Sequence, residues 1–155
     1  QHHTHVARVL PRKMENEMTN PTPTRLLHTM IRVSDLETSI KFYCDLLGMK
    51  ELRREVYETG SYSLSFIGYG DEADNTVLEL TQNHNDSAYS HGNYFGHIAF
   101  EVDDIEATVK HLADHGVTIL RQPGPMMDAD QNGKRDVIAF AADPDGYRVE
   151  LIATA

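Results

Sequence analysis

The strongest constraint on the fold is an internal repeat that relates the two halves of the chain. A histidine recurs 69 residues later, His28 with His97, and so does an aspartate suited to cap a helix, Asp35 with Asp104. The other identical pairs are Val33 with Val102, Glu37 with Glu106, Lys41 with Lys110, and Asp45 with Asp114. A repeat indicates a supersecondary unit that occurs twice and needs its copy to bury an apolar sheet face and an open edge.

Each half is predicted to be a β-α-β-β-β unit, which makes the fold class α+β with two tandem βαβββ modules and curved mixed sheets. In the first half we expect strands near 26–33, 50–57, 61–68 and 76–81, and a helix over 36–47. In the second half we expect strands near 96–102, 117–121, 136–142 and 147–152, and a helix over 105–115. Capping residues precede both helices and a glycine follows each of them: Ser34 or Asp35 with Gly48, and Asp103 or Asp104 with Gly116.

The expected organisation is one domain made of two modules. Residues 1–17 match no periodic pattern and are interpreted as a leader or expression-derived segment without fixed structure. The first module covers 25–82, a polar linker covers 83–95, and the second module covers 96–153.

The last predicted strand carries a carboxylate where an apolar residue is expected. This strand begins directly after a tight turn, Asp143–Gly146. Within the strand, Glu150 lies between Val149 and Leu151. Since side chains alternate along a strand, Glu150 faces away from these two neighbours. Such a carboxylate fits a solvated sheet face, but burying it requires a cationic partner.

The repeat gives each half one histidine and one glutamate. These residue types are ligands for a metal ion, which would be the cationic partner of Glu150. His28 is in the first strand and Glu79 in the last strand of one half, and His97 and Glu150 take these places in the other. If these strands are neighbours, a two-fold relation between halves brings two imidazoles and two carboxylates into one cleft. This donor set suits a divalent transition metal that keeps positions open for water or substrate.

Composition excludes several other classes of function. The net charge of −10 disfavours a nucleic-acid partner, since phosphate binding needs a basic surface. No stretch approaches the run of about 18 apolar residues that a membrane-spanning helix needs. Cys44 is the only cysteine, which excludes an intramolecular disulfide and favours a reducing cytoplasm.

Seven segments, taken in order, resemble one known family. They are Leu26–Val33, Phe42–Tyr43, Leu47–Met49, Phe66–Gly70, Leu78–Thr81, Tyr94–Ala99 and Asp143–Tyr147. The chain resembles the vicinal oxygen chelate superfamily and, within it, the glyoxalase I (lactoylglutathione lyase) family over about residues 25–153. The fold that this resemblance implies agrees with the two βαβββ modules.

The resemblance implies a homodimer with two equivalent sites at the subunit interface. His28 and Glu79 of one chain would join His97 and Glu150 of the other around one divalent metal ion. Short connections around the first helix and the linker favour, by resemblance, Ni²⁺ (or Co²⁺), with Zn²⁺ as the alternative, because the same ligands hold either.

The resemblance also implies a reaction. The hemithioacetal of methylglyoxal and the co-substrate glutathione is isomerised to S-lactoylglutathione by proton transfer through an enediolate, which detoxifies methylglyoxal. Glu150 would be the base, and Glu79 a ligand with a share in proton shuttling. The sequence does not distinguish glutathione from a related thiol such as trypanothione or bacillithiol.

The same resemblance indicates substrate-binding residues. Arg32 shares a strand face with His28 and resembles the arginine that binds a glutathione carboxylate, although a surface salt bridge is the alternative. Asn83 matches a substrate contact or is a linker residue, and His97 would touch substrate as well as metal. Lys134 and Arg135 would hold the glycyl carboxylate or lie in a solvated loop.

Two rival functions share this fold. A related metalloenzyme, either an extradiol dioxygenase or an acyl-CoA epimerase, would leave Glu79 without a clear role or replace it with glutamine. A metal-free protein that sequesters small molecules would not need ligands at all four positions. The presence of four competent ligands argues against both.

Overall fold

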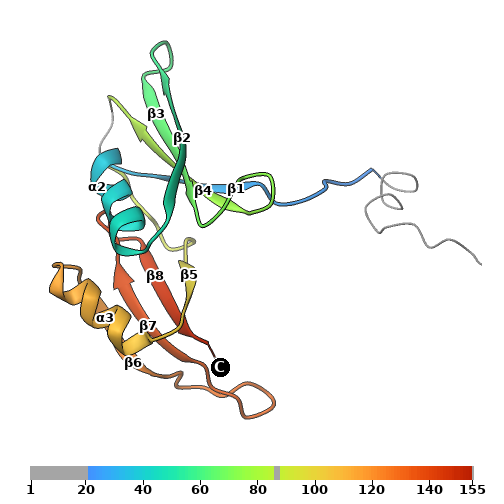
Figure 1. Cartoon of the computed structure of the whole chain (residues 1–155), viewed down its shortest axis with the longest axis vertical. Coiled ribbons are helices and arrows are strands. Elements are labelled where there is room, and N and C mark those ends of the chain that lie inside the picture. Colours follow the sequence, from blue (N-terminus) through green and yellow to red (C-terminus); the bar gives the residue numbers. More distant parts are fainter. Residues whose placement is uncertain (1–20, 86–87, 155) are drawn as a thin grey trace, which may run out of the picture.

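The computed structural model describes residues 21–85 and 88–154, so the leader expected at residues 1–17 lies outside the described residues. The first module consists of β1 (His28–Arg32), α2 (Leu36–Ile40), the π-helix η1 (Lys41–Leu46), β2 (Lys50–Tyr57), β3 (Tyr62–Gly68) and β4 (Val77–Asn83). The second consists of β5 (His97–Val102), α3 (Ile105–Asp114), β6 (Ile119–Pro125), β7 (Val137–Ala142) and β8 (Arg148–Ala153). Figure 1 shows the two helices on the same side of the molecule.

The two modules have the same sheet topology, which confirms the predicted fold class. The strand orders are β1-β4-β3-β2 and β5-β8-β7-β6. In each sheet the first and last strands of the module are parallel neighbours, and the other pairs are antiparallel. The strand with the histidine therefore lies beside the strand with the glutamate, as the predicted metal site requires.

Three elements differ from the sequence prediction. The first helix continues as a π-helix, because the Leu47 amide donates to the carbonyl of Phe42, five residues earlier. Strand β4 reaches Asn83, which therefore lies in the sheet and not at the start of the linker. Strand β6 extends through two prolines to Pro125, which is possible because it is an edge strand with irregular register.

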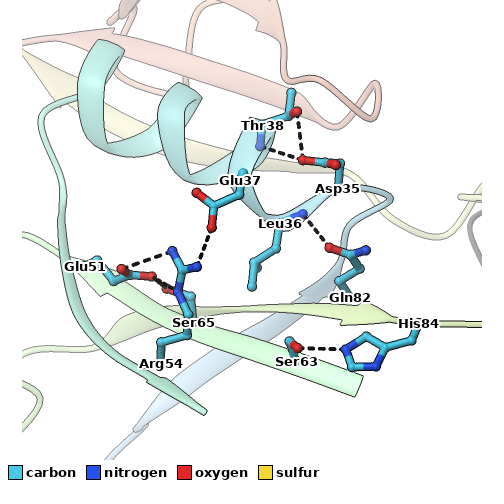
Figure 2. Close-up of polar contacts among 10 residues, drawn as sticks. All are labelled: Asp35, Leu36, Glu37, Thr38, Glu51, Arg54, Ser63, Ser65, Gln82 and His84. Carbon is cyan, nitrogen blue, oxygen red and sulfur yellow. Dashed lines mark hydrogen bonds and ion pairs between the residues drawn. The ribbon is translucent and has the colours of Figure 1, made fainter. Parts of the chain in front are cut away.

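The repeated aspartates start the two helices, as predicted. The Asp35 carboxylate accepts a hydrogen bond of 2.8 Å from the Thr38 amide, and Asp104 accepts one of 3.0 Å from the Ala107 amide. In the first module the Leu36 amide also donates to Gln82 Oε1 at 2.8 Å, which ties the helix start to β4 (Figure 2).

One hydrophobic core serves both modules. Buried side chains from the helices and from the inner faces of both sheets form a single cluster that includes Ile31, Tyr43, Leu80, Leu112 and Leu151. The modules are thus not independent units, because each covers part of the other's apolar surface.

The Asp143–Gly146 turn fastens the second module to the first. Tyr43 of the first module donates a hydrogen bond of 2.7 Å to the buried Asp143, and the Tyr147 hydroxyl donates one of 2.8 Å to the Arg32 carbonyl. Gly146 has φ +84°, the left-handed conformation that such a turn needs. Burial raises the pKa of Asp143 above its ordinary value, and the Tyr43 hydrogen bond acts in the opposite direction.

Tyr43→Phe is expected to lower the free energy of unfolding by about 1–3 kcal/mol at pH 7, because it leaves a buried carboxylate oxygen without its donor. A raised folded-state pKa means that stability falls as pH rises from the ordinary aspartate value to the raised one. Loss of the hydroxyl raises that pKa further, so the variant should lose more stability at pH 7 than at pH 4.

Urea denaturation at both pH values, at one protein concentration, measures this effect. Tyr57→Phe is the matched control, since its hydroxyl donates to Glu55 on the exposed surface and its loss should change stability by less than about 0.5 kcal/mol. An equal loss at both pH values would contradict the assigned role of the Asp143 carboxylate.

Among the described residues, no helix is both long enough and apolar enough to cross a membrane.

Candidate metal centre

The first module places His28 and Glu79 together on the sheet face that points away from the shared core. Ile31 and Leu80 point into the core, so strand alternation directs His28 and Glu79 to the other face. His28 Nε2 lies 3.5 Å from Glu79 Oε1, and the glutamate side chain is 16% exposed.

The second module repeats this arrangement with His97 and Glu150. His97 Nε2 lies 3.7 Å from Glu150 Oε1, and the glutamate side chain is 14% exposed. Val149 and Leu151 are fully buried on the core face. The predicted orientation of Glu150 relative to its two neighbours is therefore confirmed.

An aromatic ring supports each histidine in the same way. His28 meets Phe66 edge-on at a centroid distance of 5.1 Å, and His97 meets Phe140 at 5.6 Å. Each phenylalanine lies directly opposite the glutamate of its own module in the antiparallel register. Comparing the sequences of the two halves did not reveal that Phe66 and Phe140 are equivalent, because the connection between the last two strands differs in length between the modules.

An arginine covers each of these rings. The Arg53 guanidinium lies 3.6 Å from the centroid of Phe66, and that of Arg148 lies 4.7 Å from the centroid of Phe140. Arg53 is also held by Glu72, through bonds of 2.8 and 3.2 Å. Each His–Glu pair therefore lies beside a ring that an arginine covers, and in the first module that arginine is neutralised by Glu55 and Glu72.

The two glutamates differ in how firmly they are held. Thr81 Oγ1 donates a hydrogen bond of 2.7 Å to Glu79 Oε2. Ile152, the residue two positions beyond Glu150, has no hydroxyl, and within residues 21–85 and 88–154 no donor binds the Glu150 carboxylate. Glu79 is therefore held by a hydroxyl donor, and Glu150 has no such donor among the described residues. The sequence analysis missed this difference, which the spacing Glu79-x-Thr81 would have indicated, because side chains two positions apart on a strand share a face.

Each pair fits half of a metal site. Two ligand atoms that each lie about 2.1 Å from one ion are separated by about 3.0–3.4 Å, close to the observed 3.5 and 3.7 Å. The part of the chain that the structure describes holds no group of three or more His, Cys, Asp or Glu placed to share an ion. A single chain thus offers two separate ligand pairs and does not unite the four predicted ligands.

The face around the first pair is open and partly apolar. Met30 lies beside His28 on this face and is 40% exposed, and Tyr57 at the far end of the sheet is 42% exposed. Apolar side chains next to a half-buried carboxylate are typical of a surface that a partner covers.

The predicted substrate residues fall into two groups. Arg32 ends β1 on the face of His28, and Asn83 ends β4, where its Nδ2 donates to the Tyr89 hydroxyl at 3.1 Å. Lys134 and Arg135 lie in the loop between β6 and β7, and the side-chain bonds that they form with described residues stay within this loop. There Lys134 Nζ is 3.4 Å from Asp136 Oδ1, and Arg135 donates to the carbonyls of Met126 and Met127.

Comparison with known proteins finds relatives along most of this chain. Residues 25–151 match the model of the Glyoxalase/Bleomycin resistance protein/Dioxygenase superfamily. A probable lactoylglutathione lyase of Synechocystis sp. is 51% identical over 130 residues, which cover 84% of this chain and 95% of the relative. A lactoylglutathione lyase of Neisseria meningitidis is 50% identical over 128 residues, 83% of this chain and 89% of the relative.

Two solved structures are similar as well. The trypanothione-dependent glyoxalase I of Leishmania major superposes with a TM-score of 0.70 at 45% identity, over 83% of this chain and 86% of that chain. Glyoxalase I of Zea mays gives a TM-score of 0.75 at 40% identity over 84% of this chain. This chain spans only 45% of the maize chain.

Proposed function

The chain belongs to the Glyoxalase/Bleomycin resistance protein/Dioxygenase superfamily, and we propose that it is a lactoylglutathione lyase (glyoxalase I). It converts the hemithioacetal of methylglyoxal and glutathione to S-lactoylglutathione and so detoxifies methylglyoxal. The observation that carries this function is the pair of matching His–Glu half-sites on open sheet faces, in a chain about half identical to proteins of that name.

Two chains are proposed to form a homodimer with one divalent metal ion at each of two interface sites. His28 and Glu79 of one subunit and His97 and Glu150 of the other would be the ligands. Support comes from the separation of the two pairs within the described chain and from the exposed apolar residues beside the first pair. The oxygen and nitrogen donors suit Ni²⁺ or Co²⁺, with Zn²⁺ as the alternative.

The reaction moves one proton between neighbouring carbons, so it needs a base that can take the proton and return it. When bound, the metal supplies Lewis-acid stabilisation of the negative charge that develops on the substrate oxygens. Glu150 is the proposed base, because its carboxylate accepts no hydrogen bond from the described residues, so its oxygens are available to take a proton. Thr81 holds Glu79 in place, which suits a permanent ligand that takes only a minor share in proton shuttling.

The thiol part of the substrate is proposed to bind beside this centre. Arg32 and Asn83 lie at adjoining strand ends of the first sheet, so they can hold one end of glutathione. Lys134 and Arg135 remain candidates for the glycyl carboxylate if their loop rearranges when substrate binds. The enzyme is proposed to work in the reducing cytoplasm, because Cys44 is a free thiol.

Removal of the metal is expected to abolish turnover, and one added metal should restore it. The protein is treated with chelator and assayed for thioester formation from methylglyoxal and glutathione, with Ni²⁺, Co²⁺ and Zn²⁺ added back separately. The sample should lack residues 1–17, because His2, His3 and His5 could bind metal themselves. Metal uptake without activity would contradict the lyase function, and absence of uptake would contradict the metal site.

A further inference from the structure

Two histidines lie one helical turn apart at the C-terminal end of α3. His111 is in the last turn of the helix, and His115 is its C-cap residue. Residues four positions apart share one face of a helix, and here the two imidazole rings lie 4.5 Å apart between centroids, with planes inclined at 59°. The internal repeat places Phe42 and Leu46 at these positions in the first module, so the pair occurs only in the second.

A hydrogen bond fixes the tautomer of His115. Its Nδ1 lies 2.8 Å from the carbonyl oxygen of His111, and since a carbonyl can only accept, Nδ1 must carry the proton. In the neutral ring, Nε2 is then the unprotonated nitrogen and is available as a ligand. A histidine that binds a metal ion commonly donates its other ring nitrogen to a carbonyl in this way, which orients the ring and makes it a better ligand.

The spacing of the two rings suits one metal ion. Two imidazoles that bind one ion through nitrogens about 2.0–2.1 Å away, at an angle of about 90–109°, have centroids about 4.5–5.2 Å apart. The observed 4.5 Å lies within this range. Among the described residues no third His, Cys, Asp or Glu completes the set, so water fills the remaining positions of such an ion.

Both rings line an open cavity that has room for these waters. The cavity has a volume of about 610 Å³ and lies between η1, α3 and the start of the Asp143–Gly146 turn. Asp45 of η1 also lines it, and both a carboxylate and the C-terminal end of a helix favour a cation. Since α3 packs into the shared core, whereas the His–Glu pairs lie on the sheet faces that point away from it, this cavity is separate from the candidate metal centre.

We propose that His111 and His115 form a second metal site, which chelates one divalent transition-metal ion such as Zn²⁺ at the C-terminal end of α3. Imidazole nitrogens suit Zn²⁺, and the ion links the last turn of the helix to its C-cap residue, so it stabilises the folded chain. With only two protein ligands, this site binds its ion less tightly than a centre with four. It goes beyond the proposed function and does not depend on it.

Calorimetric titration of the metal-free full chain with Zn²⁺ tests the second site. His2→Ala, His3→Ala and His5→Ala are introduced throughout, so that these N-terminal histidines do not contribute. Two ions should bind per chain, the weaker one at His111 and His115. His111→Ala and His115→Ala should each lower the affinity for this weaker ion at least about tenfold, because a single imidazole can no longer chelate it.

Other properties of the two variants should remain as in wild type. Both side chains are exposed, so the affinity for the tighter ion, the turnover of the hemithioacetal and the unfolding temperature without metal should not change. His84→Ala is the matched control: His84 is also exposed, but its ring nitrogen lies 2.7 Å from Ser63 Oγ (Figure 2), and this variant should keep both ions. Excess Zn²⁺ should raise the unfolding temperature of His84→Ala more than that of His111→Ala, since an ion that binds only the folded state adds stability.

The outcomes separate the second site from the proposed function. The site is overturned if no bound ion depends on His111 and His115, or if His84→Ala loses as much affinity as they do, which would indicate adventitious binding by surface histidines. If the ion that depends on His111 binds but the hemithioacetal is not turned over, the proposed function fails and the second site stands. In His111→Ala, tight metal uptake reports the proposed interface site alone.

Discussion

Glu150→Gln should lower kcat by about 10²–10⁴, the contribution of a general base, without unfolding the protein. Glutamine has the same shape and keeps an oxygen that can bind metal, but its amide cannot take a proton from carbon. The residues that anchor this part of β8 are Val149 and Leu151, which are fully buried on the other face and are unchanged. Stability should therefore change little.

The measurement combines kcat, metal content and thermal unfolding of the variant. Glu106→Gln is a suitable control, since Glu106 lies on α3 away from both His–Glu pairs and should leave all three quantities unchanged. Glu79→Gln gives the informative contrast, because the fixed carboxylate is proposed to act mainly as a ligand and its loss should reduce metal content more strongly. A Glu150→Gln enzyme with wild-type kcat would show that the base is assigned to the wrong residue.

The secondary structure could be predicted well from sequence because the determining signals are local and occur twice. Asp35 and Asp104 accept hydrogen bonds at the helix starts, and Gly48 and Gly116 have the positive φ values that end them. The π-helix and the extension of β4 to Asn83 depend instead on packing and on pairing with β3, neither of which has a local signature. The strand expected near 117–121 extends to Pro125 in β6, because an edge strand tolerates the prolines that usually end a strand.

The chemistry of the candidate site was predictable only in part. His28 with Glu79 and His97 with Glu150 were found from the repeat, because each pair needs only neighbouring parallel strands. The stack of His91 on Tyr147 joins the linker to the turn before β8, 56 residues away in sequence, so no periodic pattern could indicate it. For that reason the sequence indicates nothing more for His91 than a place in the polar linker at 83–95.

Two inactive variants should restore activity when their subunits are combined. His28→Ala with Glu79→Ala removes the first ligand pair, and His97→Ala with Glu150→Ala removes the second. In the proposed two-fold dimer, a mixed dimer has one site with all four changes and one with all four native residues. Random pairing of equal amounts should therefore recover about a quarter of wild-type activity, since half of the dimers are mixed and each has one working site.

Co-expression with two different affinity tags isolates the mixed dimer, which should have about half the activity of wild type per dimer. Each variant alone is the control and should remain inactive, because both of its sites lack two ligands. If each chain built a complete site from its own two pairs, every site in every mixture would lack two ligands, and no activity would return. An inactive mixed dimer of proven composition would thus contradict the interface sites. Recovered activity would explain why the pairs stay separate within the described chain: each is completed by the other subunit.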